Sequence, residues 1–93
     1  MANFVIKRDG TKEPFNAEKI RRAITGAAQR TNLSEERKNE VVEQVLSAAL
    51  QLAREKEEIK TSEIKEKILS ELEVIEPSVS EVWRKYAQEK GGV

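Results

Sequence analysis

The fold of this chain is decided by residues 5–20, which read VIKRDGTKEPFNAEKI. Phe4–Lys7 is compatible with a short strand, and Lys12–Phe15 with a second strand that returns beside it. Asp9-Gly10 predicts a two-residue hairpin turn of type I′ between them, because that turn needs a positive φ at both positions. Pro14 lacks a backbone N–H and therefore places the returning strand at a sheet edge or ends it.

Two helices are expected after the hairpin. Asn16 is a good N-cap for a helix over residues 17–30, and Ser34 for a helix that runs to about Arg54. Each helix has a stripe of apolar residues at helical spacing. The stripes contain Ile20, Ala23, Ile24, Ala27 and Ala28 in the first helix, and Val41, Val42, Val45, Leu46, Ala49, Leu52 and Ala53 in the second.

The last third of the chain predicts a very short strand and two more helices. Ile59-Lys60 suits the strand, and Thr61 or Ser62 is expected to cap a third helix. Glu76-Pro77 breaks the chain, and Ser78 with a glutamate three residues on fits a capping box for a fourth helix. The buried faces are expected to hold Ile64, Ile68, Leu69 and Leu72 in the third helix, and Val79, Val82, Trp83 and Tyr86 in the fourth.

These elements predict an α+β fold, in which a small N-terminal β-hairpin or mixed sheet lies over a four-helix bundle. The chain of 93 residues suits one domain over residues 1–93, with a core of about residues 4–90 and a frayed tail at residues 91–93. Apolar residues make up 38% of the chain and aromatic residues only 4%, so the core is expected to be aliphatic.

Charge and composition exclude several classes of function. The 17 basic and 17 acidic residues cancel, which argues against bulk attraction to DNA or to an acidic membrane. Residues 1–30 nevertheless carry seven Lys and Arg against three acidic residues. The chain has no Cys and no His, no Walker A motif and no clustered pair of acids, so we expect neither catalysis nor a protein-held metal. No apolar run predicts a membrane span, and a cytoplasmic location is expected.

The sequence resembles the ATP-cone domain family. The resemblance rests on residues 5–10, then Glu13, Phe15 and Lys19-Ile20, and later the run of residues 60–64, Lys-Thr-Ser-Glu-Ile. It covers roughly Phe4–Lys90. In this family the domain forms the N-terminal allosteric site of many ribonucleotide reductases and also occurs in their transcriptional repressor. No zinc ribbon precedes the hairpin and no reductase domain follows, so we expect an excised N-terminal domain or a free-standing cone.

The resemblance implies a regulatory module that binds ATP or dATP, with Mg²⁺ held mainly by phosphate oxygens and water. It implies phosphate contacts from Lys7, Arg8 and Lys19, and base or ribose contacts from Val5, Glu13, Asn16, Ile20 and Thr61. Lys65 is a further phosphate-facing or polar candidate. The implied partners are other copies of the domain or a reductase catalytic domain.

Simpler interpretations stand beside these roles. Lys7 and Arg8 are also explained as solvated strand residues, and Glu13 as an exposed carboxylate. Thr61 is expected to cap its helix with or without a ligand, and Trp83 fits the core better than a stacking platform.

Two other functions remain open. One is a ligand-free helical module for protein–protein interaction, which would use an exposed apolar patch on the bundle. The other is nucleic-acid binding through Arg21, Arg22 and Arg30, which the neutral net charge makes unlikely.

Overall fold

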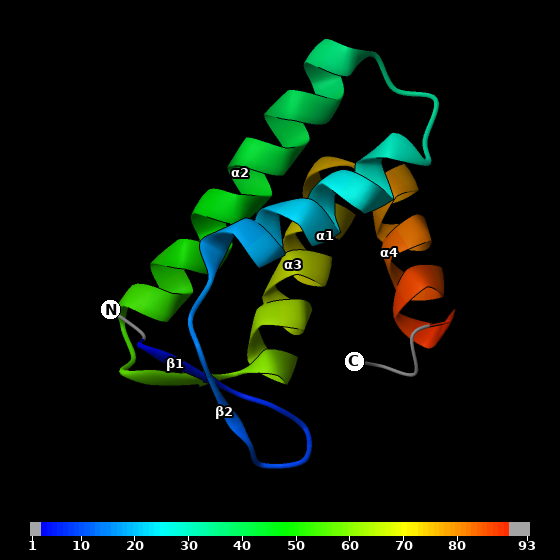
Figure 1. Cartoon of the computed structure of the whole chain (residues 1–93). Coiled ribbons are helices and arrows are strands. Elements are labelled where there is room, and N and C mark those ends of the chain that lie inside the picture. Colours follow the sequence, from blue (N-terminus) through cyan, green and yellow to red (C-terminus); the bar gives the residue numbers. More distant parts are fainter. Residues whose placement is uncertain (1–2, 90–93) are drawn as a thin grey trace.

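The computed structural model describes residues 3–89. Within that range the elements follow in the order β1 (Phe4–Ile6), β2 (Lys12–Pro14), α1 (Ala17–Gln29), α2 (Glu35–Arg54), β3 (Glu58–Lys60), α3 (Thr61–Ile75) and α4 (Pro77–Glu89). A small mixed sheet lies at one end of the helices, which confirms the expected α+β fold (Figure 1). The expectations for the Tyr86 side chain and for residues 91–93 fall outside the described part.

The three strands form one sheet in the order β2-β1-β3. β1 runs antiparallel to β2 and parallel to β3, so that Val5 lies opposite Glu13 on one side and Ile59 on the other. The predicted hairpin pairing is therefore confirmed, although each strand ends one residue earlier than expected. The predicted strand at Ile59-Lys60 is also present. Ile59 has no exposed surface, so this third strand anchors the sheet to the core.

The hairpin turn differs from the predicted type I′ geometry. Gly10 has a φ of +89°, but no non-glycine residue in the described part has a positive φ. The N–H of Gly10 donates to the carbonyl of Lys7 at 2.9 Å, so the turn is centred on Arg8-Asp9. The Asp9 carboxylate accepts the backbone N–H and the hydroxyl of Thr11, which holds Asp9 in an ordinary conformation.

Both predicted caps of the first two helices are confirmed. The Asn16 side-chain oxygen accepts the backbone N–H of Glu18 at 3.0 Å and that of Lys19 at 3.4 Å. The Ser34 hydroxyl accepts the backbone N–H of Arg37 at 3.1 Å. α1 ends at Gln29, one residue earlier than expected.

The predicted caps of the last two helices are wrong. Thr61 is the first residue of α3 rather than its cap. The Glu63 carboxylate, in the first turn of α3, accepts the backbone N–H of Lys60 at 2.9 Å and so provides a hydrogen-bond acceptor at the N-terminus of that helix. α4 begins at Pro77, before Ser78, because proline suits the first helical position. The carbonyl of Glu76 then accepts the N–H groups of residues 79 and 80.

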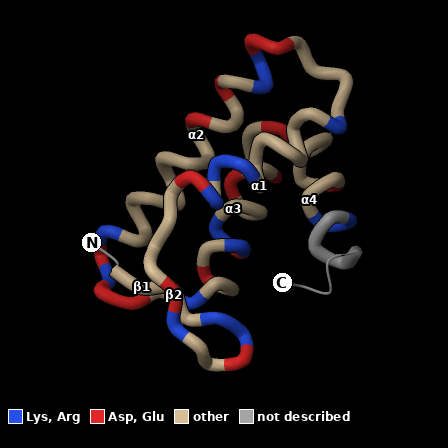
Figure 2. The backbone as a smooth tube through the Cα atoms, viewed as in Figure 1, with Lys and Arg blue, Asp and Glu red and all other residues tan. Residues whose placement is uncertain are grey.

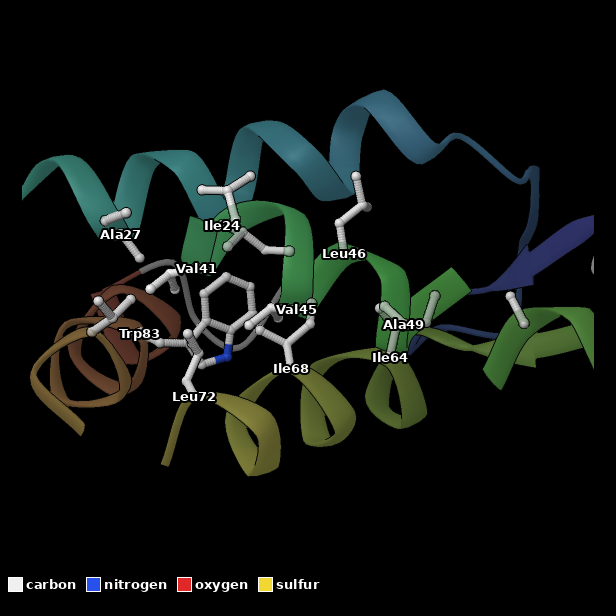
Figure 3. Packing of buried hydrophobic residues seen from close by; sticks show 14 of the residues in the cluster. Ile24, Ala27, Val41, Val45, Leu46, Ala49, Ile64, Ile68, Leu72 and Trp83 are labelled. Atoms are coloured by element: carbon white, nitrogen blue, oxygen red, sulfur yellow. The ribbon is translucent and has the colours of Figure 1, made fainter. Parts of the chain in front are cut away.

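The core lies between the four helices of the described part. α2 and α4 each pack against both α1 and α3 (Figure 1). Figure 3 shows aliphatic side chains from these helices meeting around the Trp83 indole. Trp83 is 7% exposed, which confirms it as a core residue. None of the described helices is both long enough and apolar enough to cross a membrane.

Removal of the Asn16 cap should destabilise the domain. Asn16→Ala leaves two backbone N–H groups of α1 without their side-chain acceptor, and we expect a loss of about 1 kcal/mol. Asn16→Ser keeps a capping oxygen and should retain most of the stability. Urea unfolding of the three proteins measures the difference. Equal stability of Asn16→Ala and the wild type would contradict the role of this cap.

The Glu63 cap should give a pH-dependent contribution to stability. The Lys56 ammonium is the main cause that lowers the pKa of Glu63 below 4.5, and the N–H of Lys60 adds to it. The contribution is present above pH 4.5 and is lost as the pH falls through the lower folded pKa. Glu63→Gln should therefore lower the melting temperature at neutral pH. The free energy of unfolding should fall by less than about 1 kcal/mol. Melting curves that differ equally at neutral and strongly acidic pH would contradict this.

Candidate functional site

A cleft of about 680 Å³ lies between the hairpin turn and the start of α3. Its lining comes from two segments that are about fifty residues apart in the sequence. They contribute Ile6, Lys7, Arg8, Asp9 and Gly10 from the hairpin, and Lys60, Thr61, Ser62 and Lys65 from the β3–α3 junction. Figure 2 shows basic residues along both segments at the sheet end of the molecule.

The two walls of the cleft are joined by one side chain and one strand pairing. The Thr61 hydroxyl donates to the carbonyl of Ile6 at 3.2 Å. In the parallel pairing of β1 with β3, Ile6 lies opposite Lys60. The last residue of β1 is therefore held beside the first residue of α3. Residues of the turn that follows β1 and residues at the start of α3 therefore line the same cleft.

The cleft is electropositive. Four of its lining residues, Lys7, Arg8, Lys60 and Lys65, are cationic. Asp9 is the one acidic residue of the lining, and hydrogen bonds from Thr11 hold its pKa below the usual value. The N-terminus of α3 adds the partial positive charge of its backbone N–H groups.

Lys65 shows the consequence of this concentration of charge. Partial burial is the main cause that lowers the pKa of Lys65, and the positive charge of Arg8 lowers it further. Lys65 is thus partly desolvated, and the positive charge of Arg8 acts on it across the cleft. A bound anion would stabilise the charged form of Lys65.

A second group of charges adjoins the cleft. The Glu13 carboxylate lies between two ammonium groups, 3.0 Å from Lys7 Nζ and 3.7 Å from Lys19 Nζ. The hydrogen bond with Lys7 is the main cause that lowers the pKa of Glu13 and raises that of Lys7. Lys7 lines the cleft, whereas Glu13 and Lys19 do not. Lys7 is therefore shared between the cleft and this ion pair.

The structure brings together only some of the residues that the resemblance implied. Lys7, Arg8, Thr61 and Lys65 line the cleft, and Glu13 and Lys19 adjoin it through Lys7. The other three lie elsewhere: Val5 and Ile20 pack half-buried against the core, and Asn16 caps α1.

The apolar contact of the cleft comes from Ile6 and not from Val5. Alternation predicts that Val5 and Lys7 share a face and that Ile6 and Arg8 share the other. In the structure Ile6 lines the cleft together with both Lys7 and Arg8. Ile6 and Arg8 therefore lie on one side, as alternation predicts. Lys7 follows the end of β1 and both lines the cleft and pairs with Glu13, the residue opposite Val5.

Five lining residues were not among the candidates. Ile6, Asp9 and Gly10 adjoin the predicted cations in sequence, and Lys60 and Ser62 flank Thr61. Lys60 and Ser62 belong to the same run, Lys-Thr-Ser-Glu-Ile, that pointed to Thr61. Their position next to Thr61 was the sequence signal that could have found them. The pairing of β1 with β3 was needed to place that edge beside the hairpin.

The arrangement suits a ligand with several negative charges and an apolar part. Clustered Lys and Arg with helix N–H groups bind phosphate oxygens, and Ile6 offers an apolar contact. The volume lies in the range of small-molecule sites. Residues 3–89 contain no group of three or more acidic residues that could hold a metal ion.

Comparison with known proteins agrees with this chemistry. The model of the ATP cone domain matches residues 3–88. The chain is also similar to the transcriptional repressor NrdR of Akkermansia muciniphila, with 35% identity over 74 residues. That match covers 78% of this chain and 44% of the repressor, so the chain spans less than half of its relative. The match over almost the whole described part shows that the chain belongs to the ATP-cone family.

Proposed function

We propose that this chain is a regulatory module that binds ATP or dATP in the cleft between the hairpin turn and α3. The observation that carries the proposal is the concentration of four cationic residues around the N-terminus of a helix, in a chain with no net charge. Such a site attracts a polyphosphate without attracting nucleic acid in bulk. Membership of the ATP-cone family supports the choice of an adenine nucleotide.

Different residues of the cleft are proposed to contact different parts of the nucleotide. Arg8 and Lys65 face a shared space and serve the phosphates, with Lys7 at the cleft edge. The N–H groups at the start of α3 are further phosphate donors, and Ile6 offers an apolar surface to the base or ribose. Mg²⁺ would accompany the triphosphate through phosphate oxygens and water. The contacts that the resemblance implied for Val5, Asn16, Lys19 and Ile20 stay part of the proposal, on the α1 side of the hairpin.

The module is proposed to work as part of a larger regulator. The similar repressor is more than twice as long as the matched segment, which leaves room for other functions in that protein. A ribonucleotide reductase is the other setting that the resemblance implied. In either setting, a nucleotide that favours one assembly has to bind that assembly more tightly. Nucleotide-dependent self-association or docking to a neighbouring domain is therefore the proposed output.

Saturating ATP or dATP should stabilise the wild-type chain. A ligand at about 100 times its dissociation constant stabilises the native state by roughly 2.7 kcal/mol. For a domain of this size that corresponds to a melting shift on the order of 10 °C. Thermal melting with ATP, dATP and GTP measures the effect. An unmoved melting curve with both adenine nucleotides would favour the ligand-free interaction module.

Lys65→Ala should weaken ATP binding about tenfold or more, since hydrogen bonds to charged groups contribute roughly 1.5–3 kcal/mol. The matched control is Lys85→Ala, which removes an exposed lysine of α4 that does not line the cleft. Calorimetric titration with ATP compares the two variants. A similar loss of affinity in both would mean that general charge, rather than this cleft, determines binding.

A further inference from the structure

Glu13 occupies an unusual place for a residue beside a phosphate site. It lies on β2, directly opposite Val5, and its carboxylate reaches both Lys7 and Lys19. These two lysines are proposed phosphate ligands. The Glu13 carboxylate is thus an anion that both lysines already contact.

The ion pairs of Glu13 with Lys7 and Lys19 are exposed to solvent, so a ligand can replace Glu13 as the partner of these lysines. The side chains of Lys7 and Glu13 are 43% and 38% exposed, and that of Lys19 is 69% exposed. Ion pairs with this much exposure are weak, because water screens the charges and both side chains lose freedom. A triphosphate carries several charges and accepts hydrogen bonds through many oxygens, so it outcompetes a single carboxylate for these lysines.

We propose that Glu13 is an internal counter-ion that competes with the phosphates of the ligand for Lys7 and Lys19, and thereby lowers the affinity of the site. The inference rests on the proposed function, because it assumes that the ligand carries phosphates. It differs from a role for Glu13 as a base or ribose contact. A contact to the base or ribose strengthens binding, whereas a competing carboxylate weakens it.

The other carboxylates around the hairpin do not fill this role. Asp9 lines the cleft, but its carboxylate accepts two hydrogen bonds from Thr11. Glu58 pairs with Lys12, and neither of them lines the cleft. Of the hairpin carboxylates, Glu13 is the one with a described ion pair to a lysine that lines the cleft, Lys7.

The competition predicts that affinity rises when the charge of Glu13 is removed. Glu13→Gln keeps the shape of the side chain and frees Lys7 and Lys19 for the ligand. We expect ATP and inorganic tripolyphosphate to bind about two- to fivefold more tightly, the range that corresponds to an exposed ion pair. AMP should gain less, because it presents fewer charges. Calorimetric titration at one fixed ionic strength measures all three ligands.

Glu58→Gln is the matched control. It removes the same charge from another lysine pair on the same sheet, outside the cleft. Its affinities should stay close to those of the wild type, and melting curves without ligand verify that both variants fold. An equal gain in both variants would show a general charge effect and would overturn the proposal.

The outcomes separate this inference from the proposed function. If the wild type binds ATP and Glu13→Gln binds it equally, the counter-ion role is wrong. If Glu13→Gln binds ATP more weakly, the counter-ion role is also wrong and a base or ribose contact replaces it. If the wild type does not bind ATP, the proposed function fails. Tripolyphosphate then still tests the competition, and failure of Glu13→Gln to bind it more tightly than the wild type would overturn the inference as well.

Discussion

The cleft of this domain depends on the attachment of β1 to the β3–α3 junction. The parallel pairing of β1 with β3 and the hydrogen bond from Thr61 to the Ile6 carbonyl hold the end of one strand beside the start of a helix. The pairing also carries Ile59, which is fully buried, so the sheet cannot shift without disturbing the core. Without this attachment the hairpin would be an isolated two-stranded ribbon, which is marginal in water.

The electropositive character of the site comes from topology rather than from net charge. The chain is neutral, yet the attachment brings cations from residues 7–8 next to cations from residues 60 and 65. The partial charge of a helix N-terminus lies between them. The free protein offsets part of this field with Asp9, which Thr11 holds, and with Glu13, which pairs with Lys7 and Lys19. The positive charge at the edge of the cleft is therefore partly neutralised by carboxylates of the protein itself.

The apolar stripes and the predicted caps allowed α1 and α2 to be predicted from the sequence. Each helix begins directly after its predicted cap and ends within one residue of the expected position. The local details failed where a different interaction satisfied the backbone. Thr61 is not the cap because α3 already begins at this residue, and its hydroxyl donates to the Ile6 carbonyl. Asp9 did not adopt a positive φ because the turn is centred on Arg8-Asp9, and in the described part Gly10 takes the positive φ instead. The cleft itself was predicted in part. The resemblance implied three of its four cations, Lys7, Arg8 and Lys65, whereas the pairing of β1 with β3 was needed to place Ile6 and Lys60 there.

The central claim is that an adenine nucleotide binds between the hairpin turn and the start of α3. Backbone amide chemical shifts of the ¹⁵N-labelled chain, recorded during titration with ATP, test it most directly. The described part contains a second, shallower cleft of about 400 Å³, lined by residues 30–33 and by residues 78 and 82, which serves as an internal comparison. The account predicts the largest shifts at residues 6–10 and 60–65. Shifts concentrated around the second cleft, or no saturable shifts, would contradict it.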